Sequence, residues 1–183
     1  FIIGEKFIKK DNVALILGDN FFYGHNLTQE LIDCTKLTSG AKILLHGVKN
    51  PNLYGVATIN KNKKVLKLVE KPKIFKSNLA VTGLYFFDNK VINYSKKLKP
   101  SKRNEIEIID LLNIYKKRNM LKANQLGRGS VWLDTGSIDD FNSASDFVST
   151  IEKRQGFKIA CPEEIALNKK WINKKHIIKA IKF

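Results

Sequence analysis

Two apolar runs separated by one amphipathic helix are the feature that most constrains the fold of this chain. Residues 13–17 form the first run, which ends in Gly-Asp-Asn, and residues 41–48 form the second. Runs of this length without polar alternation are typical of strands buried on both faces. Between them, Asn26 can cap a helix, with Gln29 three positions later and apolar residues at helical spacing to about Lys36. The order strand, helix, strand predicts an α/β fold with a parallel sheet covered by helices.

The middle of the sequence predicts an antiparallel addition to that sheet. Residues 55–59 and 65–69 are rich in β-forming side chains and are joined by a short polar turn, as in a hairpin. Residues 79–87 predict a further strand, dense in β-branched and aromatic residues. Asp88 can then cap a short helix, which Pro100 ends.

The last third of the sequence predicts mainly helices. Ser137 can cap a long helix, and Gly156 lies just past its end. Pro162, at the first position of a turn rich in Glu, begins a helical and then basic tail. The other elements expected here are an amphipathic helix at residues 105–118 and short strands at residues 121–126 and 131–133.

Composition narrows the class of protein. The two cysteines, Cys34 and Cys161, are too few for a disulfide framework and lack the spacing of metal ligands, which favours a reducing, cytoplasmic setting. No apolar run reaches the roughly 18 to 20 residues that a membrane span needs. The net charge of +16 suggests a nucleic-acid-binding module as an alternative. However, the Lys pairs are spread along the chain and the aromatic residues lie in apolar runs, which disfavours that interpretation.

Two acidic residues each follow a predicted buried strand. Asp19 follows the first apolar run, and Asp134 stands in the sequence Trp-Leu-Asp-Thr-Gly. In open α/β sheets, ligands bind outside the carboxyl ends of strands, where such carboxylates can share one hard cation. The functional interpretation of these two residues is a site that binds magnesium and phosphate. The alternative is ordinary turn chemistry, in which each Asp bonds nearby backbone amides.

Two further clusters can bind a ligand with hydroxyls and a phosphate. Glu70 can accept hydrogen bonds from neighbouring hydroxyls, Lys71 supplies a point charge, and Gly55 allows close approach to the backbone. Lys102 and Arg103 precede a helix, where a guanidinium suits an anion. Solvated surface charge is the alternative for both clusters, and for Lys102 it is the preferred one.

Taken together, these motifs resemble the glucose-1-phosphate thymidylyltransferases, members of the sugar nucleotidyltransferase family. The resemblance covers essentially all 183 residues. The motifs that carry it, in chain order, are Leu17-Gly-Asp-Asn, Phe22-Tyr23-Gly24-His25, Tyr54-Gly55-Val56, Glu70-Lys71-Pro72, Ser77-Asn78, Val81-Thr82-Gly83-Leu84-Tyr85, Leu98-Lys-Pro-Ser, Gly127-Arg128-Gly129, Trp132-Leu-Asp-Thr-Gly136, Glu152-Lys-Arg-Gln-Gly156 and Ala160-Cys-Pro-Glu-Glu-Ile165.

The resemblance implies a fold and indicates which part of the family's catalytic domain the chain covers. The fold is a Rossmann-like, mostly parallel mixed sheet with flanking helices, incomplete at its N-terminus. Residues 1–157 would be the distal part of the catalytic domain, and residues 158–183 a helical C-terminal extension of the same domain. The family begins with a glycine-rich nucleotide-binding loop that is not found here, so the chain looks like the distal two-thirds of an enzyme. Asn104 and Ile109 depart from the family's usual Gly and Thr, and neither is expected to touch a residue with an assigned role.

The resemblance also implies an activity. The family transfers a thymidylyl group from dTTP to glucose 1-phosphate with Mg²⁺, the first step of dTDP-rhamnose synthesis for cell-surface polysaccharides such as the lipopolysaccharide O-antigen. Asp19 and Asp134 would bind the metal, and Lys71 and Arg103 would hold the sugar phosphate. The substrate-binding residues implied are Asn20, Tyr54, Gly55, Glu70, Val81 and Trp132.

Regulation is implied as well. The family is typically a tetramer that dTDP-rhamnose inhibits at a second site. The residues matching that site are Tyr23, Gly24, Gly127, Cys161, Glu164 and Ile165, although Cys161 is equally well explained as a small buried apolar residue. Two alternatives stay open: a nucleotidyltransferase with another base or sugar, and a truncated chain without activity of its own.

Overall fold

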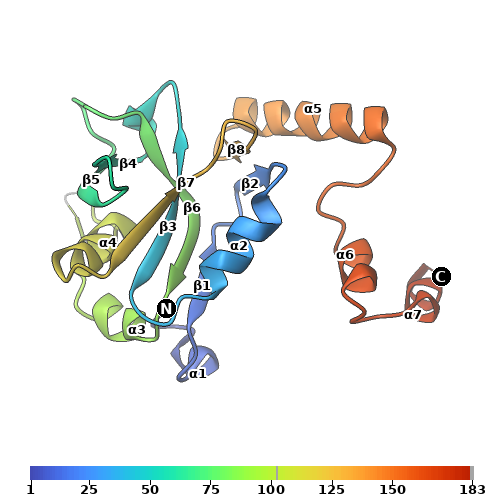
Figure 1. The fold of residues 1–183 in the computed structure, drawn as a ribbon, viewed down its shortest axis with the longest axis horizontal. Helices are drawn as coiled ribbons and strands as arrows, with labels where there is room; N and C mark the ends of the chain where they lie inside the picture. The colour runs from blue at the N-terminus through green and yellow to red at the C-terminus, as the bar shows by residue number, and fades with distance from the viewer. Residues whose placement is uncertain (102, 182–183) are drawn as a thin grey trace. The chain divides into compact units, whose positions relative to one another are not determined.

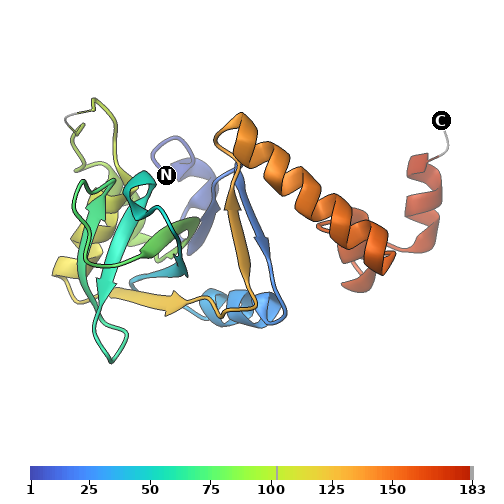
Figure 2. The same ribbon diagram turned by 90° about the horizontal axis from the view of Figure 1, so that it is seen from above.

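The computed structural model describes residues 1–101 and 103–181, which form two compact units, residues 1–135 and residues 136–181. Figures 1 and 2 show the ribbon from two directions. The first unit holds every strand that the structure describes, and the second is helical. The predicted domain division between residues 157 and 158 stays a prediction.

A six-stranded sheet organises the first unit around one long strand, β6 (Leu79–Phe87). The strand β3 pairs with β6 along one side, from residue 79 to residue 87. On the other side, β1 pairs with residues 84–87 and β4 with residues 79–80. The remaining strands of this sheet are β1 (Val13–Ile16), β3 (Ala41–Gly47), β4 (Gly55–Ile59), β5 (Val65–Glu70) and β7 (Leu121–Gln125).

The directions of the strands confirm the predicted mixed sheet, in which most of the described strands share one direction although only β3 and β7 are neighbours that pair in parallel. Both β1 and β3 run antiparallel to β6, so they run parallel to each other, joined by α2 (Leu27–Thr35) as predicted. The strand β7 is parallel to β3, and β4 is antiparallel to β6. Four strands therefore share one direction, whereas β5 and β6 run the opposite way. The predicted hairpin is also present, as β4 and β5.

The prediction that residues 13–17 are buried on both faces is wrong. Strand β1 alternates between half-buried and exposed residues, and Ile16 is 56% exposed. The reason is its place beside the C-terminal half of β6, where it pairs with that strand alone. A long apolar run therefore indicated a strand correctly but did not reveal its environment.

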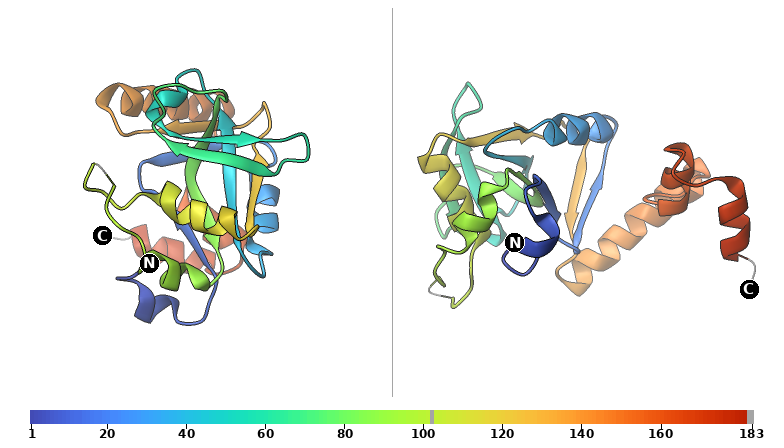
Figure 3. Two further views of the ribbon diagram at one scale, coloured as in Figure 1. Left: turned by 90° about the vertical axis from the view of Figure 1, so that its left-hand side faces the viewer. Right: turned by 90° about the horizontal axis from the view of Figure 1, so that it is seen from below.

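Two apolar layers cover the opposite faces of the sheet. Because side chains alternate along a strand, Tyr85 and Phe87 face one layer while Leu84 and Phe86 face the other. The first layer is completed by α3 (Lys90–Ser95) and α4 (Ile108–Lys117), the second by α2. Figure 3 shows these helices and the sheet from two further directions. A fully buried leucine in such a layer contributes about 2 kcal/mol to stability through apolar burial.

Asp88 connects the edge of this core to the helices. Its carboxylate accepts hydrogen bonds from the buried Tyr115 hydroxyl at 2.8 Å and from the Gly40 N–H at 2.7 Å. It also accepts a bond from the Lys90 N–H at 3.2 Å. The prediction that Asp88 caps α3 is wrong, because Asn89 is the N-cap residue and Asp88 lies one position before it. A buried carboxylate with several donors is stabilised in place rather than left as an unpaired charge.

Three short elements differ from the sequence-based predictions. The helix expected at residues 105–118 begins only at Ile108, and residues 105–107 are not helical, with Glu107 extended. A short helix, α1 (Glu5–Ile8), and a strand, β2 (Asn20–Tyr23), were not predicted. Strand β2 pairs antiparallel with β8 (Val131–Asp134) in a separate two-stranded sheet. Short strands of this kind depend on a partner far away in sequence, which local pattern does not reveal.

The second unit contains α5 (Ile138–Gln155), α6 (Pro162–Asn168) and α7 (Lys174–Ile181). The predicted caps of α5 are confirmed: the Ser137 hydroxyl accepts a bond from the Asp140 N–H at 3.1 Å, and Gly156 has a left-handed φ of 70°. Among the described residues of this unit, only Ala144 is buried. Within the described part of the chain, no helix combines the length and the apolar character that crossing a membrane requires.

Candidate active site

The candidate site lies where two strands on the same side of β6 diverge, a place called here the fork of β6. Strands β1 and β4 lie on the same side of β6 and diverge at residues 81–83. A cavity of about 210 Å³ lies at this fork. The predicted residues that line it are all six of the proposed substrate-binding residues together with one cation and one acid: Asn20, Tyr54, Gly55, Glu70, Val81, Trp132, Lys71 and Asp134.

Asn20 is the hydrogen-bonding centre of one wall. Its amide oxygen accepts bonds from the Gly83 N–H at 2.8 Å and from the Trp132 indole N–H at 2.6 Å. Its amide nitrogen donates to the Asp19 carboxylate at 2.8 Å. A Cβ atom on Gly83 would lie only 2.5 Å from the Asn20 side chain, so glycine is required for this close approach.

The two predicted metal ligands lie at one end of the β2–β8 pair: Asp19 immediately precedes β2, and Asp134 is the last residue of β8. Asn20 pairs with Asp134 in the strand register, and the Asp19 carbonyl accepts a bond from the Thr135 N–H at 2.7 Å. Burial raises the pKa of Tyr85, and the charges of Glu70, Asp134 and Asp19 raise it further. Both acids therefore act on one hydroxyl in the cavity wall. Asp134 lines the cavity itself, whereas Asp19 is joined to it through Asn20.

The donor set of these two acids fits a hard divalent cation. Carboxylate oxygens are the ligands that Mg²⁺ prefers, and Mg²⁺ is commonly bound by one or two carboxylates together with water and substrate phosphates. The described residues contain no group of three or more His, Cys, Asp or Glu side chains that could enclose a metal ion. A metal held here would therefore take its remaining ligands from water or from a bound phosphate.

The opposite wall is formed by the ends of β4 and β5. Gly55 pairs with Glu70 in the register of this hairpin, and the Lys71 N–H donates to the Tyr54 carbonyl at 3.0 Å. The rings of Tyr54 and Trp132 are 5.0 Å apart and meet edge to face, which connects the two walls. The site therefore has a hydrogen-bonding wall, a charged wall and an aromatic pair between them.

Ile109 corrects one prediction about this wall. The sequence analysis expected it to touch no residue with an assigned role, but it lines the cavity. A Cβ atom on Gly55 would lie 2.6 Å from the Ile109 side chain and 3.2 Å from the Glu70 carboxylate. Ile109 therefore packs directly over Gly55, and any larger residue at position 55 would displace both neighbours.

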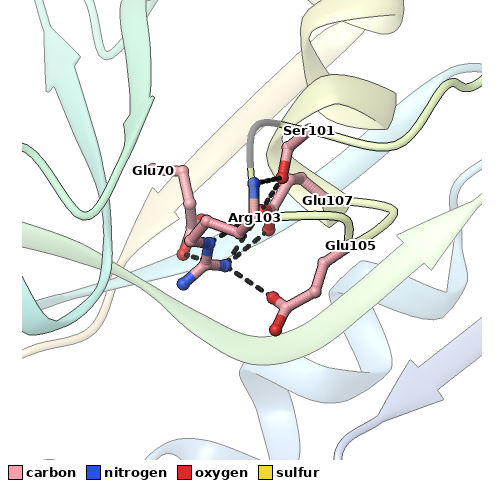
Figure 4. Close-up of polar contacts among 5 residues, drawn as sticks. All are labelled: Glu70, Ser101, Arg103, Glu105 and Glu107. Carbon is pink, nitrogen blue, oxygen red and sulfur yellow. Dashed lines mark hydrogen bonds and ion pairs between the residues drawn. The ribbon is translucent and has the colours of Figure 1, made fainter.

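Arg103 lies beside the cavity in a cluster of carboxylates (Figure 4). Its Nη2 atom is 3.8 Å from Glu70, 2.8 Å from Glu105 and 2.9 Å from Glu107. Arg103 does not line the cavity and is connected to it through Glu70, which does. The predicted partner Lys102 lies outside the described residues. Asn104 has a φ of 61°, a left-handed conformation that Asn tolerates well.

Burial and charge act in opposite directions on the acids of this cluster. Burial raises the pKa of Glu70, and the nearby Glu107 charge raises it further, against the opposing charges of Arg103 and Lys71. Burial also acts to raise the pKa of Glu107, but hydrogen bonds from Ser101 and Arg103 lower it overall. Of Glu70 and Glu107, Glu70 is therefore the acid whose charged form is disfavoured, and it lines the cavity.

The six residues predicted for a regulatory site fall into both units. Tyr23 pairs with Val131, Gly24 packs against Ser130, and the Gly127 carbonyl accepts a bond from the Ser130 N–H. These three residues gather around one turn of the first unit. The other three, Cys161, Glu164 and Ile165, lie at the start of α6 in the second unit. Cys161 and Cys34 are both free thiols.

Gly83 and Tyr85 also belong to the site, although the sequence did not assign them to it. Both line the cavity, and Tyr85 is only 3% exposed. They follow Val81 at intervals of two residues on β6, so the alternation of a strand places all three on the same face. Extending the assignment of Val81 along that face would have found them.

Comparisons with known proteins show which family the chain belongs to. The family described as nucleotidyl transferase matches residues 1–151. The chain belongs to the nucleotidyl transferase family. A glucose-1-phosphate thymidylyltransferase from Neisseria meningitidis is 47% identical over 173 residues, which cover 94% of this chain and 60% of that protein. The chain therefore spans less than two thirds of the length of this curated relative.

Two solved structures share the fold of this chain. A Bacillus anthracis protein, provisionally named a glucose-1-phosphate thymidylyltransferase and solved with a sucrose, superposes with a TM-score of 0.70 at 40% identity. The match covers 79% of this chain and 57% of that one. A UDP-glucose pyrophosphorylase solved with UDP-glucose also gives a TM-score of 0.70, at 27% identity, over 81% of this chain and 60% of its own.

Proposed function

We propose that this protein transfers a thymidylyl group from dTTP to glucose 1-phosphate, giving dTDP-glucose and pyrophosphate. The main support for the proposal is the cavity between β1 and β4 beside β6. Its lining combines Glu70, which can accept hydrogen bonds from sugar hydroxyls, with Lys71 and Asp134. Relatives at 43–49% identity carry the name of this activity. In the reaction, a phosphate oxygen of glucose 1-phosphate bonds to the α-phosphorus of dTTP while the bond to pyrophosphate breaks.

The hexose would lie between Gly55, Glu70 and Val81. The Glu70 carboxylate can accept hydrogen bonds from neighbouring hydroxyls, and Gly55 lines the cavity beside it, under the side chain of Ile109. The Val81 backbone stands where β1 and β4 diverge, so it is open to a ligand on that side. Asn20 and Trp132 hold each other in the facing wall and limit the space for the sugar.

The phosphate of the sugar would be held by cations at the charged wall. Lys71 lines the cavity, and Arg103 stands beside it next to Glu70. The attacking phosphate oxygen is already ionised at neutral pH, so the reaction requires no catalytic base. Two polyanions repel each other, and fixed cations that neutralise them lower the barrier by positioning and by electrostatic stabilisation.

Asp19 and Asp134 would hold Mg²⁺ at the end of the β2–β8 pair. When bound, Mg²⁺ supplies charge neutralisation for the reacting phosphates. Asn20 keeps the Asp19 carboxylate oriented through its 2.8 Å hydrogen bond. The family resemblance further suggests a cytoplasmic homotetramer, inhibited by dTDP-rhamnose, that supplies polysaccharide synthesis.

The proposal is tested by pyrophosphate release with glucose 1-phosphate and a panel of nucleoside triphosphates, with and without Mg²⁺. We expect turnover to depend on Mg²⁺ and dTTP to be the preferred donor. A preference for UTP would favour the second candidate, uridylyl transfer, which the structural likeness to a UDP-glucose pyrophosphorylase motivates. In parallel, calorimetry of the 183-residue chain with glucose 1-phosphate tests the sugar-phosphate site, and an absence of binding would contradict the proposal.

A further inference from the structure

The guanidinium of Arg103 is hydrogen-bonded to Glu107 along one edge. Its Nε and Nη2 atoms both donate to Glu107 Oε1, at 3.1 and 2.9 Å, and Nη2 also donates to Oε2 at 2.9 Å. Figure 4 shows these hydrogen bonds together with the neighbouring acids. Two donors on one carboxylate fix the plane of the guanidinium as well as its position.

Glu107 is itself held in place. Its side chain is only 11% exposed, and its Oε1 accepts a bond from the Ser101 hydroxyl at 2.8 Å. It immediately precedes α4, and its carbonyl accepts from the Asp110 N–H at 3.2 Å. The loop that carries Arg103 is closed by a bond from the Ser101 N–H to the Glu105 carbonyl at 2.8 Å. Glu107 is therefore a fixed partner.

Glu105 is a different kind of partner. Its side chain is 62% exposed, and its carboxylate contacts only Nη2 of the guanidinium, at 2.8 Å. Nη1 makes no hydrogen bond to any of the described residues. A guanidinium has a second pair of parallel donors, Nη1 and the outer N–H of Nη2, which matches two oxygens of a phosphate. In this structure that second pair is opposed only by the exposed Glu105 and by Glu70 at 3.8 Å.

We propose that Glu107 is a positioning residue that holds Arg103 by its Nε and Nη2 edge, so that the sugar phosphate binds the remaining pair of donors and displaces Glu105. The inference rests on the proposed function, because it assigns a support to the arginine that would bind glucose 1-phosphate. The two acids contact the same atom of Arg103, yet one supports the anion site and the other competes with the anion.

The proposal and simple electrostatics predict opposite changes in the affinity for glucose 1-phosphate when Glu107 is replaced by Gln. Removing a negative charge beside an anion site strengthens anion binding if charge is all that matters. If Glu107 positions Arg103, Glu107→Gln instead weakens glucose 1-phosphate binding by about tenfold, the value of one lost charge-assisted hydrogen bond. Glu105→Gln strengthens it about twofold, the scale of an exposed ion pair. The matched control is Glu5→Gln, which removes an exposed carboxylate paired with Lys96 in the same unit.

The experiment is calorimetric titration of the full chain and these variants with glucose 1-phosphate, with glucose as a second ligand. We expect Glu107→Gln to lose affinity for glucose 1-phosphate but not for glucose, since only the former carries the phosphate. Binding of glucose 1-phosphate to Glu107→Gln that equals or exceeds that of the unaltered chain overturns the inference alone. No binding to the unaltered chain overturns the proposed function and the inference with it.

A second variant keeps the test valid if Glu107→Gln does not fold. Ser101→Ala preserves the Glu107 charge but removes the hydroxyl that holds it and that also accepts from the Arg103 N–H at 3.1 Å. We expect an affinity for glucose 1-phosphate that is about two- to threefold weaker, because Glu107 keeps its charge and its bonds to Arg103 and loses only the support of Ser101. Unchanged affinity in Ser101→Ala would contradict the fixed-partner role of Glu107.

Discussion

The helices α4 and α5 each present an apolar face in sequence but differ in burial. In α4, Ile109, Leu111, Leu112 and Tyr115 are all buried against the sheet. In α5, which is longer, only Ala144 is buried and Phe141 is 58% exposed. The comparison teaches that a periodic pattern predicts a helix and its apolar face but not whether that face has a partner. The candidate active site lies wholly in the unit whose helices have one.

Asp134→Asn is expected to have the largest effect. It removes a carboxylate that lines the cavity, so Mg²⁺-dependent turnover should fall about 100- to 1,000-fold, as when one electrostatic contact to the reacting groups is lost. Thermal unfolding should change little. The matched control in the second unit is Asp146→Asn, an exposed residue of α5, which should leave turnover unchanged. Equal turnover in the two variants would remove Asp134 from the metal site.

The second prediction compares apolar burial in the two units directly. Leu44 in β3 is fully buried, so Leu44→Ala should lower the free energy of unfolding by about 2–5 kcal/mol. Ile165 in α6 is 47% exposed, so Ile165→Ala should change it by less than about 0.5 kcal/mol. Urea denaturation followed by circular dichroism measures both values. Similar losses would mean that a partner buries the α6 face in solution.

A third prediction extends the contrast to the site itself. Gly83→Ala places a methyl group 2.5 Å from Asn20, so it should cost about 1–3 kcal/mol of stability and weaken glucose 1-phosphate binding. In Gly129→Ala the new methyl group meets no atom within 4 Å, so little change is expected. Thermal unfolding and calorimetry of the pair test the prediction. A harmless Gly83→Ala would show that the wall formed by Asn20 is not tightly packed.

The smallest effect is expected for Glu70→Gln, as a shift in the midpoint of thermal unfolding. Because burial raises the pKa of Glu70 in the folded chain, ionisation of Glu70 destabilises the fold as the pH rises through that pKa. Glu70→Gln should therefore raise the midpoint of thermal unfolding slightly at pH 7 and not at pH 4, while weakening sugar binding. The exposed Glu164→Gln should do neither. A lower midpoint at pH 7 for Glu70→Gln would contradict the sign of this effect.

Much of the fold could be predicted because its patterns are local. The hairpin of β4 and β5, the strand β6 and the caps of α5 all follow from turn residues, β-branched runs and a serine before a helix. Strand β2 could not be predicted, because its four residues pair with β8 more than a hundred positions away. The exposure of β1 was also missed, since an edge strand and a central strand can have the same apolar sequence.

The same division holds for the candidate site. Family motifs identified the residues of the cavity wall, but spacing alone did not show that Asn20 bonds both Gly83 and Trp132. Nor did it show that Arg103 lies among carboxylates, because residues 105–107 were expected to be helical. These features depend on distances between segments, which only the folded chain fixes.

The central claim is that Asp19 and Asp134 share a divalent cation beside a bound hexose phosphate. The most direct measurement is a crystal structure of the chain with Mn²⁺ and glucose 1-phosphate, with the metal located by its anomalous scattering. The account predicts one Mn²⁺ coordinated by both carboxylates, with the hexose against Gly55 and Glu70. A metal bound elsewhere, or a sugar phosphate outside the cavity at the fork of β6, would contradict it.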